Sequence, residues 1–307
     1  MHPDLAKLEQ QFGRSILTKV DDPWLNRFGV ELWVKRDDLL DPVISGNKWR
    51  KLKYILDHAL SLNRHVIVSM GGPYSNHLHA LAGIGRQLGL ETAGLIRGEA
   101  RMTPTLADIQ NWGMHLRFVS RTEYRALRDY RGWDDLPGLE QGGYWLPEGG
   151  AVVLARQGVA ELVTEIGVPY DVICAPCGTG ATLAGIIGSV SSDVTVLGFA
   201  ALKDSGFLSR DVERLLTEPH DNWRISVDYH FGGFAKVRPE LLAFIERFSA
   251  TTSIPLEPVY TGKMIYGIYD LIQRGRFRPG QRIIAVHTGG LQGNRGFGLC
   301  KDYSNRN

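Results

Sequence analysis

The sequence has few cysteines, no excess of either charge and no uninterrupted long apolar run. Its 307 residues include three cysteines, so at least one is unpaired within the chain, which suits a reducing compartment. Basic residues number 35 and acidic residues 33, and this balance argues against a protein that lives on nucleic acid or on an anionic membrane surface. We expect the partner to be a small molecule.

Segments that direct or anchor proteins to membranes are also lacking. Residues 1–5 contain no basic stretch followed by an apolar region, so we expect no secretory signal and a cytoplasmic protein. The longest uncharged stretch, 172–192, has the length of a membrane span, but Pro176 and four glycines interrupt it. We interpret it as a strand, a glycine loop and a helix.

No complete metal-ligand pattern is found. Cys174 and Cys177 have the C-x-x-C spacing of redox pairs and of half zinc sites. A second cysteine pair is missing, and Cys174 ends the apolar run 172–174. We therefore interpret the two residues as buried strand cysteines and predict no metal site.

What the sequence does have is an alternation of short β-rich runs with helical patterns. Strands are expected at 32–34, 66–68, 92–96, 115–119, 172–175, 194–200 and 282–287. Helices are expected from about Asn47 and from about Ser75, and another after residue 182. This alternation predicts an α/β protein with a parallel sheet, and the chain length predicts two domains or one large one.

Glycine pairs follow several of these strands, at 71–72, 149–150, 178–180 and 289–290. Ligands of open parallel sheets bind at the carboxyl ends of strands, so these loops could meet at one cleft. The acidic, aromatic and glycine-rich segment 131–150 is interpreted as a boundary between two α/β units.

Lys48 is the leading candidate for chemistry. It follows the turn-forming run Ser-Gly-Asn at 45–47 and begins a segment with helical periodicity. At a helix start the dipole disfavours positive charge, which keeps an amine reactive. Such a lysine can form a Schiff base with a carbonyl cofactor, most commonly pyridoxal phosphate. Because residues 50–53 carry three more basic side chains, a solvated basic helix face is the alternative interpretation.

A glycine motif after the strand at 172–175 could bind a phosphate. Its residues are Gly178, Thr179, Gly180, Ala181 and Thr182. Glycines let backbone N–H groups approach an anion, and a helix N-terminus and hydroxyl donors favour the negative charge. The segment lacks the lysine of a P-loop and the last glycine of a dinucleotide fingerprint. It is a candidate phosphate cup, with an ordinary tight turn as the alternative.

Three consecutive polar residues begin the helix near residue 75. Ser75 or Asn76 could cap this helix, which explains one polar residue. Together with His77 they could also hold a carboxylate through hydroxyl and backbone donors. Capping alone is one alternative for the segment, and a helix-surface histidine is the alternative for His77.

In their order along the chain, these motifs resemble those of the fold-type-II pyridoxal-phosphate enzymes, the tryptophan synthase β-subunit superfamily. The similarity is greatest to the branch with 1-aminocyclopropane-1-carboxylate (ACC) deaminase and D-cysteine desulfhydrase. The matching motifs are Lys-Arg-Asp-Asp at 35–38, Ser-Gly-Asn-Lys-Trp-Arg-Lys-Leu at 45–52, Gly-Gly-x-x-Ser-Asn-His at 71–77, Gly-Thr-Gly-Ala-Thr at 178–182, Pro-Val-Tyr-Thr-Gly-Lys at 258–263 and His-Thr-Gly-Gly at 287–290. The resemblance covers about residues 10–300.

The resemblance implies a role for each matching residue. Lys48 would form the Schiff base with pyridoxal 5'-phosphate, and residues 178–182 would hold its phosphate. Asn76 would contact the phenolic oxygen of the ring, and Tyr260 would stack on the ring. Ser75 and the neighbouring amides would hold the carboxylate of an amino-acid substrate.

The resemblance also implies a two-domain, three-layer αβα architecture with open twisted, mostly parallel sheets. We expect residues 1–50 and 159–307 to form a large cofactor-binding domain. Residues 51–158 would form a smaller inserted α/β domain, with the cofactor between the two. Enzymes of this type often close one domain on the other, and we expect a homodimer.

Two cofactor-binding positions bear on the reaction. ACC deaminases typically have glutamate after the stacking tyrosine and leucine in the last motif, whereas the desulfhydrase-like pattern has hydroxyl residues, here Thr261 and Thr288. A hydroxyl near the pyridine nitrogen leaves it largely neutral. A neutral ring suits β-elimination, because the leaving thiolate takes up the electron pair. We therefore expect Lys48 to take the α-proton of D-cysteine, which gives pyruvate, ammonia and sulfide.

One loop departs from the branch, which commonly has a second active-site tyrosine in a Gly-x-Gly-Tyr-Gly-like segment. Here the segment is 230–236, with Phe234 in place of the tyrosine, and Tyr229 is the other candidate for the role. Two alternative functions stay open. One is ACC deamination to 2-oxobutanoate and ammonia, and the other is a non-catalytic relative that binds the cofactor or a phosphorylated metabolite.

Overall fold

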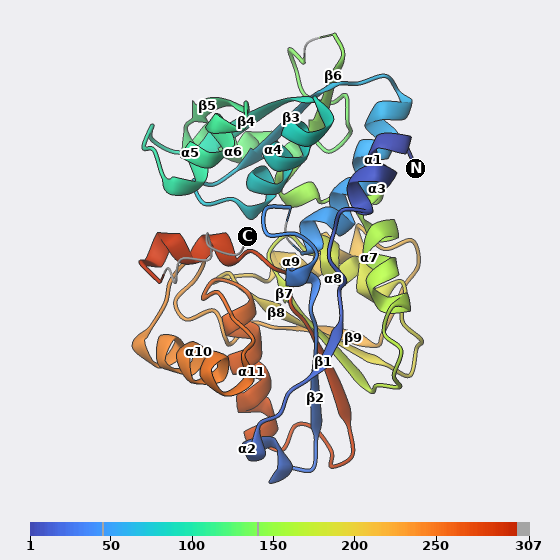
Figure 1. The fold of residues 1–307 in the computed structure, drawn as a ribbon, viewed down its shortest axis with the longest axis vertical. Coiled ribbons are helices and arrows are strands. Elements are labelled where there is room, and N and C mark those ends of the chain that lie inside the picture. Colours follow the sequence, from blue (N-terminus) through green and yellow to red (C-terminus); the bar gives the residue numbers. More distant parts are fainter. Residues whose placement is uncertain (45, 140, 300–307) are drawn as a thin grey trace.

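The computed structural model describes residues 1–44, 46–139 and 141–299, so Ser45 of the lysine motif and Cys300 lie outside the described residues. Within these ranges the strands form two sheets (Figure 1). The larger has the order β1-β2-β10-β7-β8-β9 and the smaller has the order β5-β4-β3-β6. Neighbouring strands are parallel, except that β1 pairs antiparallel with β2. The predicted α/β class with mostly parallel sheets is confirmed.

Each expected strand and helix is found within a few residues of its predicted position. The strands are β1 (Leu17–Lys19), β2 (Glu31–Lys35), β3 (Val66–Gly71), β4 (Glu91–Arg97), β5 (His115–Val119), β6 (Gly143–Leu146), β7 (Val172–Cys177), β8 (Thr195–Ala200), β9 (Trp223–Ser226) and β10 (Arg282–Val286). The helices are α1 (Pro3–Glu9), α2 (Pro23–Asn26), α3 (Asn47–Ser61), α4 (Asn76–Leu88), α5 (Pro104–Asn111), α6 (Arg121–Ala126), α7 (Ala155–Thr164), α8 (Ala181–Ile187), α9 (Phe207–Glu213), α10 (Pro239–Thr252) and α11 (Thr261–Gln273). The short 3-10 segments are η1 (Asp37–Leu39), η2 (Leu127–Asp129), η3 (Glu148–Gly150) and η4 (Leu291–Phe297).

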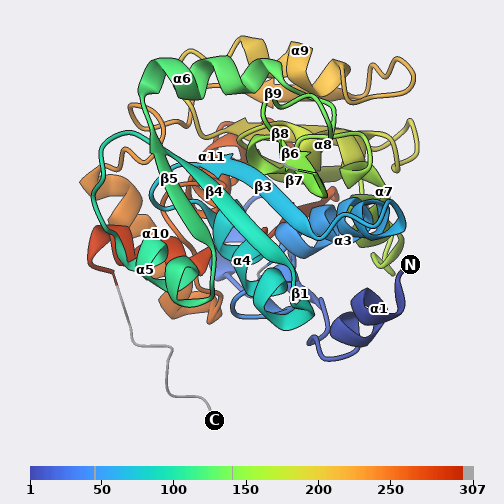
Figure 2. The same ribbon diagram turned by 90° about the horizontal axis from the view of Figure 1, so that it is seen from above.

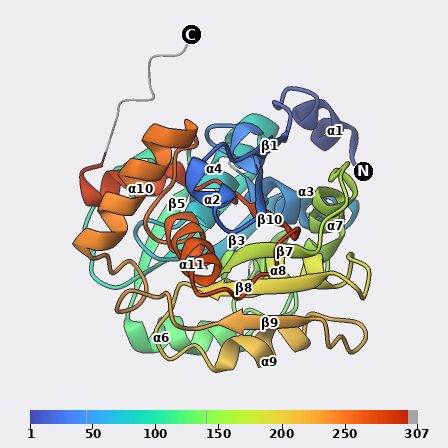
Figure 3. The same ribbon diagram turned by 90° about the horizontal axis from the view of Figure 1, so that it is seen from below.

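The two sheets draw on different parts of the chain. All strands of the smaller sheet lie between residues 66 and 146, whereas those of the larger sheet precede residue 36 or follow residue 171. Helix α3 packs beside α7, which in turn packs on α8 (Figure 2). Helices α10 and α11 lie together, and α11 packs on β7 and β8 of the larger sheet (Figure 3). The exact domain limits at residues 50 and 158 stay a prediction.

One sequence interpretation was wrong in part: the segment 131–150 is more than a boundary. It contains β6, which pairs in parallel with β3 at the edge of the smaller sheet. Tyr144 and Trp145 of this strand are buried. The strand was not predicted because only four residues pair, and glycines flank and begin it. The short strands β1 and β9 were missed for the same reason, since periodicity needs length to be recognised.

The two cysteines of the C-x-x-C pattern are buried and free, as the sequence indicated. Both lie on β7, but Cys174 packs in the core beneath α10 and α11, whereas Cys177 packs in the core beneath α8. Because successive strand residues point to opposite faces, a spacing of three places them on different sides of the sheet. Burial also raises the pKa of both thiols, so neither is a ready nucleophile.

Candidate active site

The basic residues that follow Lys48 on α3 are buried and paired, which rules out a solvated basic face. Arg50 is 3% exposed, and its guanidinium bonds Asp37 at 3.1 Å and Glu165 at 2.5 Å. Lys53 is also 3% exposed. The Arg50 contacts fix α3 between the end of β2 and the end of α7, and they thereby position Lys48 at the carboxyl end of the larger sheet.

Three of the predicted motifs meet at the start of α3. The ammonium of Lys48 donates to Oδ1 of Asn47 at 2.5 Å, and Nδ2 of Asn47 donates to the hydroxyl of Thr182 at 2.7 Å. The backbone amide of Asn47 also donates to the backbone carbonyl of Thr288 at 3.3 Å. Gly46 has φ 61°, and a Cβ there would lie 2.1 Å from that carbonyl, so only glycine allows this approach.

The amine of Lys48 is easily deprotonated. Burial lowers its pKa from 10.5 to about 8, and the charge of Glu257 opposes this shift. Sequence reasoning attributed the reactivity to the helix dipole, whereas the structure indicates burial as the main cause. A lysine with such a pKa can act as nucleophile and base near neutral pH.

The glycine motif 178–182 spans the turn between β7 and α8 and the first residues of α8. Gly180 has φ 82° and precedes the first residue of α8. A Cβ on Gly178 would lie 3.1 Å from the ring of Tyr260, so the ring lies directly over the motif. A Cβ on Gly149 would lie 3.0 Å from Thr179, which brings the 149–150 glycine pair to the same place.

Lys51 is a site residue that sequence reasoning missed. Its side chain is 3% exposed and its ammonium donates to the carbonyl of Gly149. Burial and the neighbouring charge of Lys48 hold its pKa well below the usual range. An anion bound at 178–182 would favour the protonated form of this amine, and the resulting cation would complement the anion. The available signal was its spacing, since it lies one helical turn beyond Lys48 and faces the same side.

The start of α4 is capped and still has donors to offer. The hydroxyl oxygen of Ser75 accepts the Leu78 amide at 3.2 Å, so its own proton is free for another acceptor. Oδ1 of Asn76 accepts from Nε2 of Gln292 at 2.5 Å. The capping interpretation is therefore correct for Ser75 and does not exclude ligand binding.

His77 is buried at 3% exposure, so the helix-surface interpretation is wrong. The hydroxyl of Ser69 donates to the carbonyl of Leu146 at 2.7 Å, and it therefore accepts from Nε2 of His77 at 2.9 Å. This leaves Nδ1 as an acceptor, and among the described residues this buried atom has no partner. Burial and the charges of Lys51 and Lys48 hold the pKa of His77 well below its usual range, so the ring is neutral.

A buried carboxylate lies beneath the Tyr260 motif. Glu257 is 1% exposed and accepts the backbone amides of Val259, Tyr260 and Thr261 at 2.6 to 2.8 Å. Burial raises its pKa, and these bonds oppose the rise. The hydroxyl of Thr261 donates to Glu257 at 3.2 Å, so its proton is already engaged. Sequence reasoning missed Glu257, although a lone acidic residue before a helix start is a capping signal.

The structure separates the two candidates for the second tyrosine. The ring of Phe234 lies edge-on to that of Tyr260, with centroids 5.9 Å apart. Tyr229 is instead buried in the core beneath α11, where its hydroxyl donates to Asp270 at 2.6 Å. Phe234 therefore occupies the position beside Tyr260.

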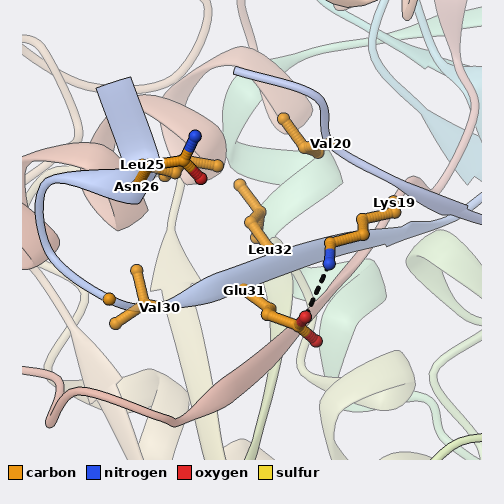
Figure 4. Close-up of a pocket in the computed structure, with 8 residues that line it drawn as sticks. Lys19, Val20, Leu25, Asn26, Val30, Glu31 and Leu32 are labelled. Atoms are coloured by element: carbon orange, nitrogen blue, oxygen red, sulfur yellow. Dashed lines mark hydrogen bonds and ion pairs between the residues drawn. The ribbon is translucent and has the colours of Figure 1, made fainter. Parts of the chain in front are cut away.

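A separate pocket of about 220 Å³ lies where β1 ends and β2 begins (Figure 4). Its polar groups include Lys19 and Glu31, which pair with each other at 2.5 Å. None of its lining residues belongs to the predicted motifs, so this pocket is not part of the site.

The described part of the chain shows neither a metal site nor a membrane-spanning helix. No group of three or more histidine, cysteine, aspartate or glutamate residues is arranged to hold a metal ion. No helix there has the length and apolarity needed to cross a membrane.

The residues brought together fit one cofactor. They offer an amine of low pKa, glycine amides with a buried cation for a phosphate, an aromatic ring and an amide donor. Together with two mostly parallel sheets, this set defines a pyridoxal-phosphate enzyme. Residues 16–289 match the family model described as pyridoxal-phosphate dependent enzyme, and the chain belongs to this family, whose cofactor it uses.

Comparison with individual proteins places the chain in the ACC deaminase branch of this family. A provisionally named ACC deaminase of Pyrococcus furiosus is 30% identical, over 97% of this chain and 98% of that protein. The bifunctional D-cysteine desulfhydrase/ACC deaminase, mitochondrial, of Arabidopsis thaliana is 30% identical, over 86% and 73%. The crystal structure of an ACC deaminase homologue superimposes with a TM-score of 0.79 at 27% identity, over 97% and 98%.

Proposed function

We propose that the chain catalyses α,β-elimination of D-cysteine, or of a related β-substituted D-amino acid. With D-cysteine and water the products are pyruvate, ammonia and hydrogen sulfide. The plant relative is named for this activity together with ACC deamination. Of these two activities, the one proposed for this chain is D-cysteine desulfhydration.

The observation that carries this choice is the side chain beside Tyr260. In the family resemblance a second tyrosine hydroxyl belongs near this ring, and Phe234 offers none. The hydroxyl of Tyr229 is engaged with Asp270 in the core. Opening a cyclopropane ring needs a proton donor or acceptor at a carbon atom, whereas elimination of a thiolate needs only a base at the α-carbon.

Pyridoxal phosphate, when bound, supplies an aldehyde and an electron-withdrawing ring. The residues that would hold it are Lys48, Lys51, Asn76, Gly178, Thr179, Gly180, Ala181, Thr182, Tyr260, Thr261 and Thr288. Their chemistry matches its parts. The amides and Lys51 would face the phosphate, Asn76 would donate to the phenolic oxygen and Tyr260 would cover the ring.

Three side chains would act on the substrate. The free proton of Ser75 would be donated to the substrate carboxylate, and the adjacent amides of α4 would add donors. The unpartnered Nδ1 of His77 would accept a hydrogen bond from a bound polar group. Lys48 would take the α-proton, after which the carbon–sulfur bond breaks and sulfur leaves with the electron pair.

Product analysis tests the proposal. Purified protein supplied with pyridoxal phosphate should release sulfide and pyruvate in equal amounts from D-cysteine and no 2-oxobutanoate from ACC. Lys48→Ala should lower the rate by about 1,000-fold or more, since it removes the base and the cofactor attachment. Lys236→Ala, an exposed lysine in the same chain, should keep the wild-type rate.

Each other outcome identifies an alternative. Release of 2-oxobutanoate without sulfide would assign ACC deamination. Cofactor binding without turnover of either compound would assign a non-catalytic relative. If no visible absorption band forms with the cofactor, and Lys48→Ala changes nothing, the site assignment itself is wrong.

A further inference from the structure

Gln292 joins the C-terminal segment to the smaller sheet. It lies on η4, which packs against α5 (Figure 1). Its Oε1 accepts the hydroxyl of buried Thr105 at 2.6 Å and the guanidinium of Arg295 at 3.1 Å. Its Nε2 donates to Oδ1 of Asn76 at 2.5 Å and lies 3.5 Å from the carbonyl oxygen of Tyr74.

These contacts fix which atom of each amide faces which neighbour. A guanidinium has donors and no acceptor, so the Gln292 atom that faces Arg295 must be the carbonyl oxygen. Arg295 is itself held by Asp108 at 2.6 Å. The amide nitrogen of Gln292 must then face Asn76, and the Asn76 atom that meets it must be the oxygen.

The consequence is a free donor at the candidate active site. Because Oδ1 of Asn76 is taken by Gln292, Nδ2 points the other way, and it has no acceptor among the described residues. A Cβ on Gly290 would lie 2.5 Å from this Nδ2, so the nitrogen lies directly against the glycine of the His-Thr-Gly-Gly motif. An amide without a partner could adopt either of its two orientations, whereas the hydrogen bond from Gln292 fixes one orientation of the Asn76 side chain.

We propose that Gln292 is a positioning residue that makes Asn76 present its N–H, and not its carbonyl, to the phenolic oxygen of pyridoxal phosphate. The inference rests on the proposed contact between Asn76 and the cofactor. Of the residues that Gln292 contacts, Asn76 alone is proposed to contact the cofactor. The effect of Gln292 on cofactor binding therefore passes through Asn76.

Gln292→Glu reverses the orientation with almost no change in shape. One carboxylate oxygen keeps the bonds from Arg295 and Thr105, and the other can only accept, so Asn76 must turn its N–H toward residue 292. Its carbonyl then faces the phenolic oxygen, and two acceptors oppose each other. The Kd for pyridoxal phosphate, measured from the visible absorption band, should rise about tenfold or more. Gln292→Met, which imposes no orientation, should give a smaller rise.

A double-mutant cycle separates positioning from a structural effect. In an Asn76→Ala background, Gln292→Glu should leave the Kd unchanged, because the residue through which it acts is gone. Gln110→Glu adds the same charge at an exposed site on α5 and should leave the Kd at the wild-type value. The midpoint of urea unfolding without cofactor should be the same for Gln292→Glu and wild type.

The outcomes are distinct. An equal rise in Kd in both backgrounds, or no rise in Gln292→Glu, would overturn the positioning role. If Asn76→Ala binds as tightly as wild type, the positioning role is also overturned, while the cofactor site at Lys48 stands. Absence of cofactor binding by the wild type would overturn the proposed function, and this inference with it.

Discussion

Burial of the Lys48 ammonium costs folding free energy. Its pKa falls from 10.5 to about 8 on folding, so between these values the unfolded chain binds more protons at Lys48 than the folded chain. Stability therefore rises with pH across this window. Below about pH 8 the full cost of burying the charged amine applies. At pH 7 the same shift leaves about a tenth of the lysine as free amine, which is what the chemistry needs. Lys53, one turn and a residue further on, is buried with two carboxylate partners, Glu9 and Glu161.

Lys48→Met and Lys53→Met should consequently change stability in opposite directions. Without cofactor at pH 7, Lys48→Met should be more stable than wild type by about 1–2 kcal/mol, allowing for solvent screening of its partly exposed side chain. This gain should shrink as pH rises toward 10.5. Lys53→Met should be less stable by about 1–3 kcal/mol, because it leaves two carboxylates without their cation. Urea unfolding at several pH values measures both, and destabilisation by Lys48→Met at pH 7 would contradict the argument.

Elements with long patterns could be predicted from sequence, and single buried charges could not. The α3 stripe and the apolar runs of β3, β7 and β10 gave boundaries within three residues, because periodicity over many positions reports a buried face. The candidate residues of α3, α4, α8 and β10 were predicted to meet for a similar reason, since parallel strands end on one side. Lys51 was missed because its hydrogen bond is to Gly149, which is distant in sequence. Glu257 was missed because its charge acts on Lys48, which is also distant in sequence, although its hydrogen bonds are local.

The loop 230–236 is an element that sequence could not place. It contains positive φ angles at Phe231, Gly232, Gly233 and Ala235, which are costly for the two residues with side chains. Lys263 of α11 compensates: its buried ammonium donates to the carbonyls of His230 at 2.9 Å, Gly233 at 2.8 Å and Ala201 at 3.4 Å.

Removal of this ammonium should loosen the loop and with it Phe234. Lys263→Met should increase amide hydrogen exchange in residues 230–236 by about tenfold or more, since hydrogen bonds to a charged group are lost. Lys236→Met changes an exposed lysine of the same loop and should leave the exchange unchanged. Equal exchange in Lys263→Met and wild type would show that the loop is held by other contacts. Substrate range should widen with the loosened loop, because Phe234 borders the space over Tyr260.

At the scale of the whole molecule, the two sheets share one of the cores formed by the described residues. A single cluster of buried residues includes Ile67 and Tyr144 of the smaller sheet, Ile173 and Ile284 of the larger one and Ile55 of α3. The domains proposed from the sequence meet through this cluster, with α3 against α7. Any closure of one proposed domain on the other has to keep these apolar contacts, so it would be a small rotation about α3 rather than a separation.

A shared core predicts that both sheets unfold together. Ile55 is fully buried, and Ile55→Ala should lower the free energy of unfolding by about 2–5 kcal/mol. Hydrogen exchange measured at increasing denaturant should then show that β3 and β7 lose the same amount of protection. The reason is that a cavity at Ile55 of α3 removes packing contacts from both sheets. Leu62→Ala, at a residue that is 39% exposed just beyond α3, should change neither. If β3 lost protection at lower denaturant than β7, the sheets would be independent units, and the boundaries at residues 50 and 158 would gain thermodynamic meaning as the limits of a separately folding domain.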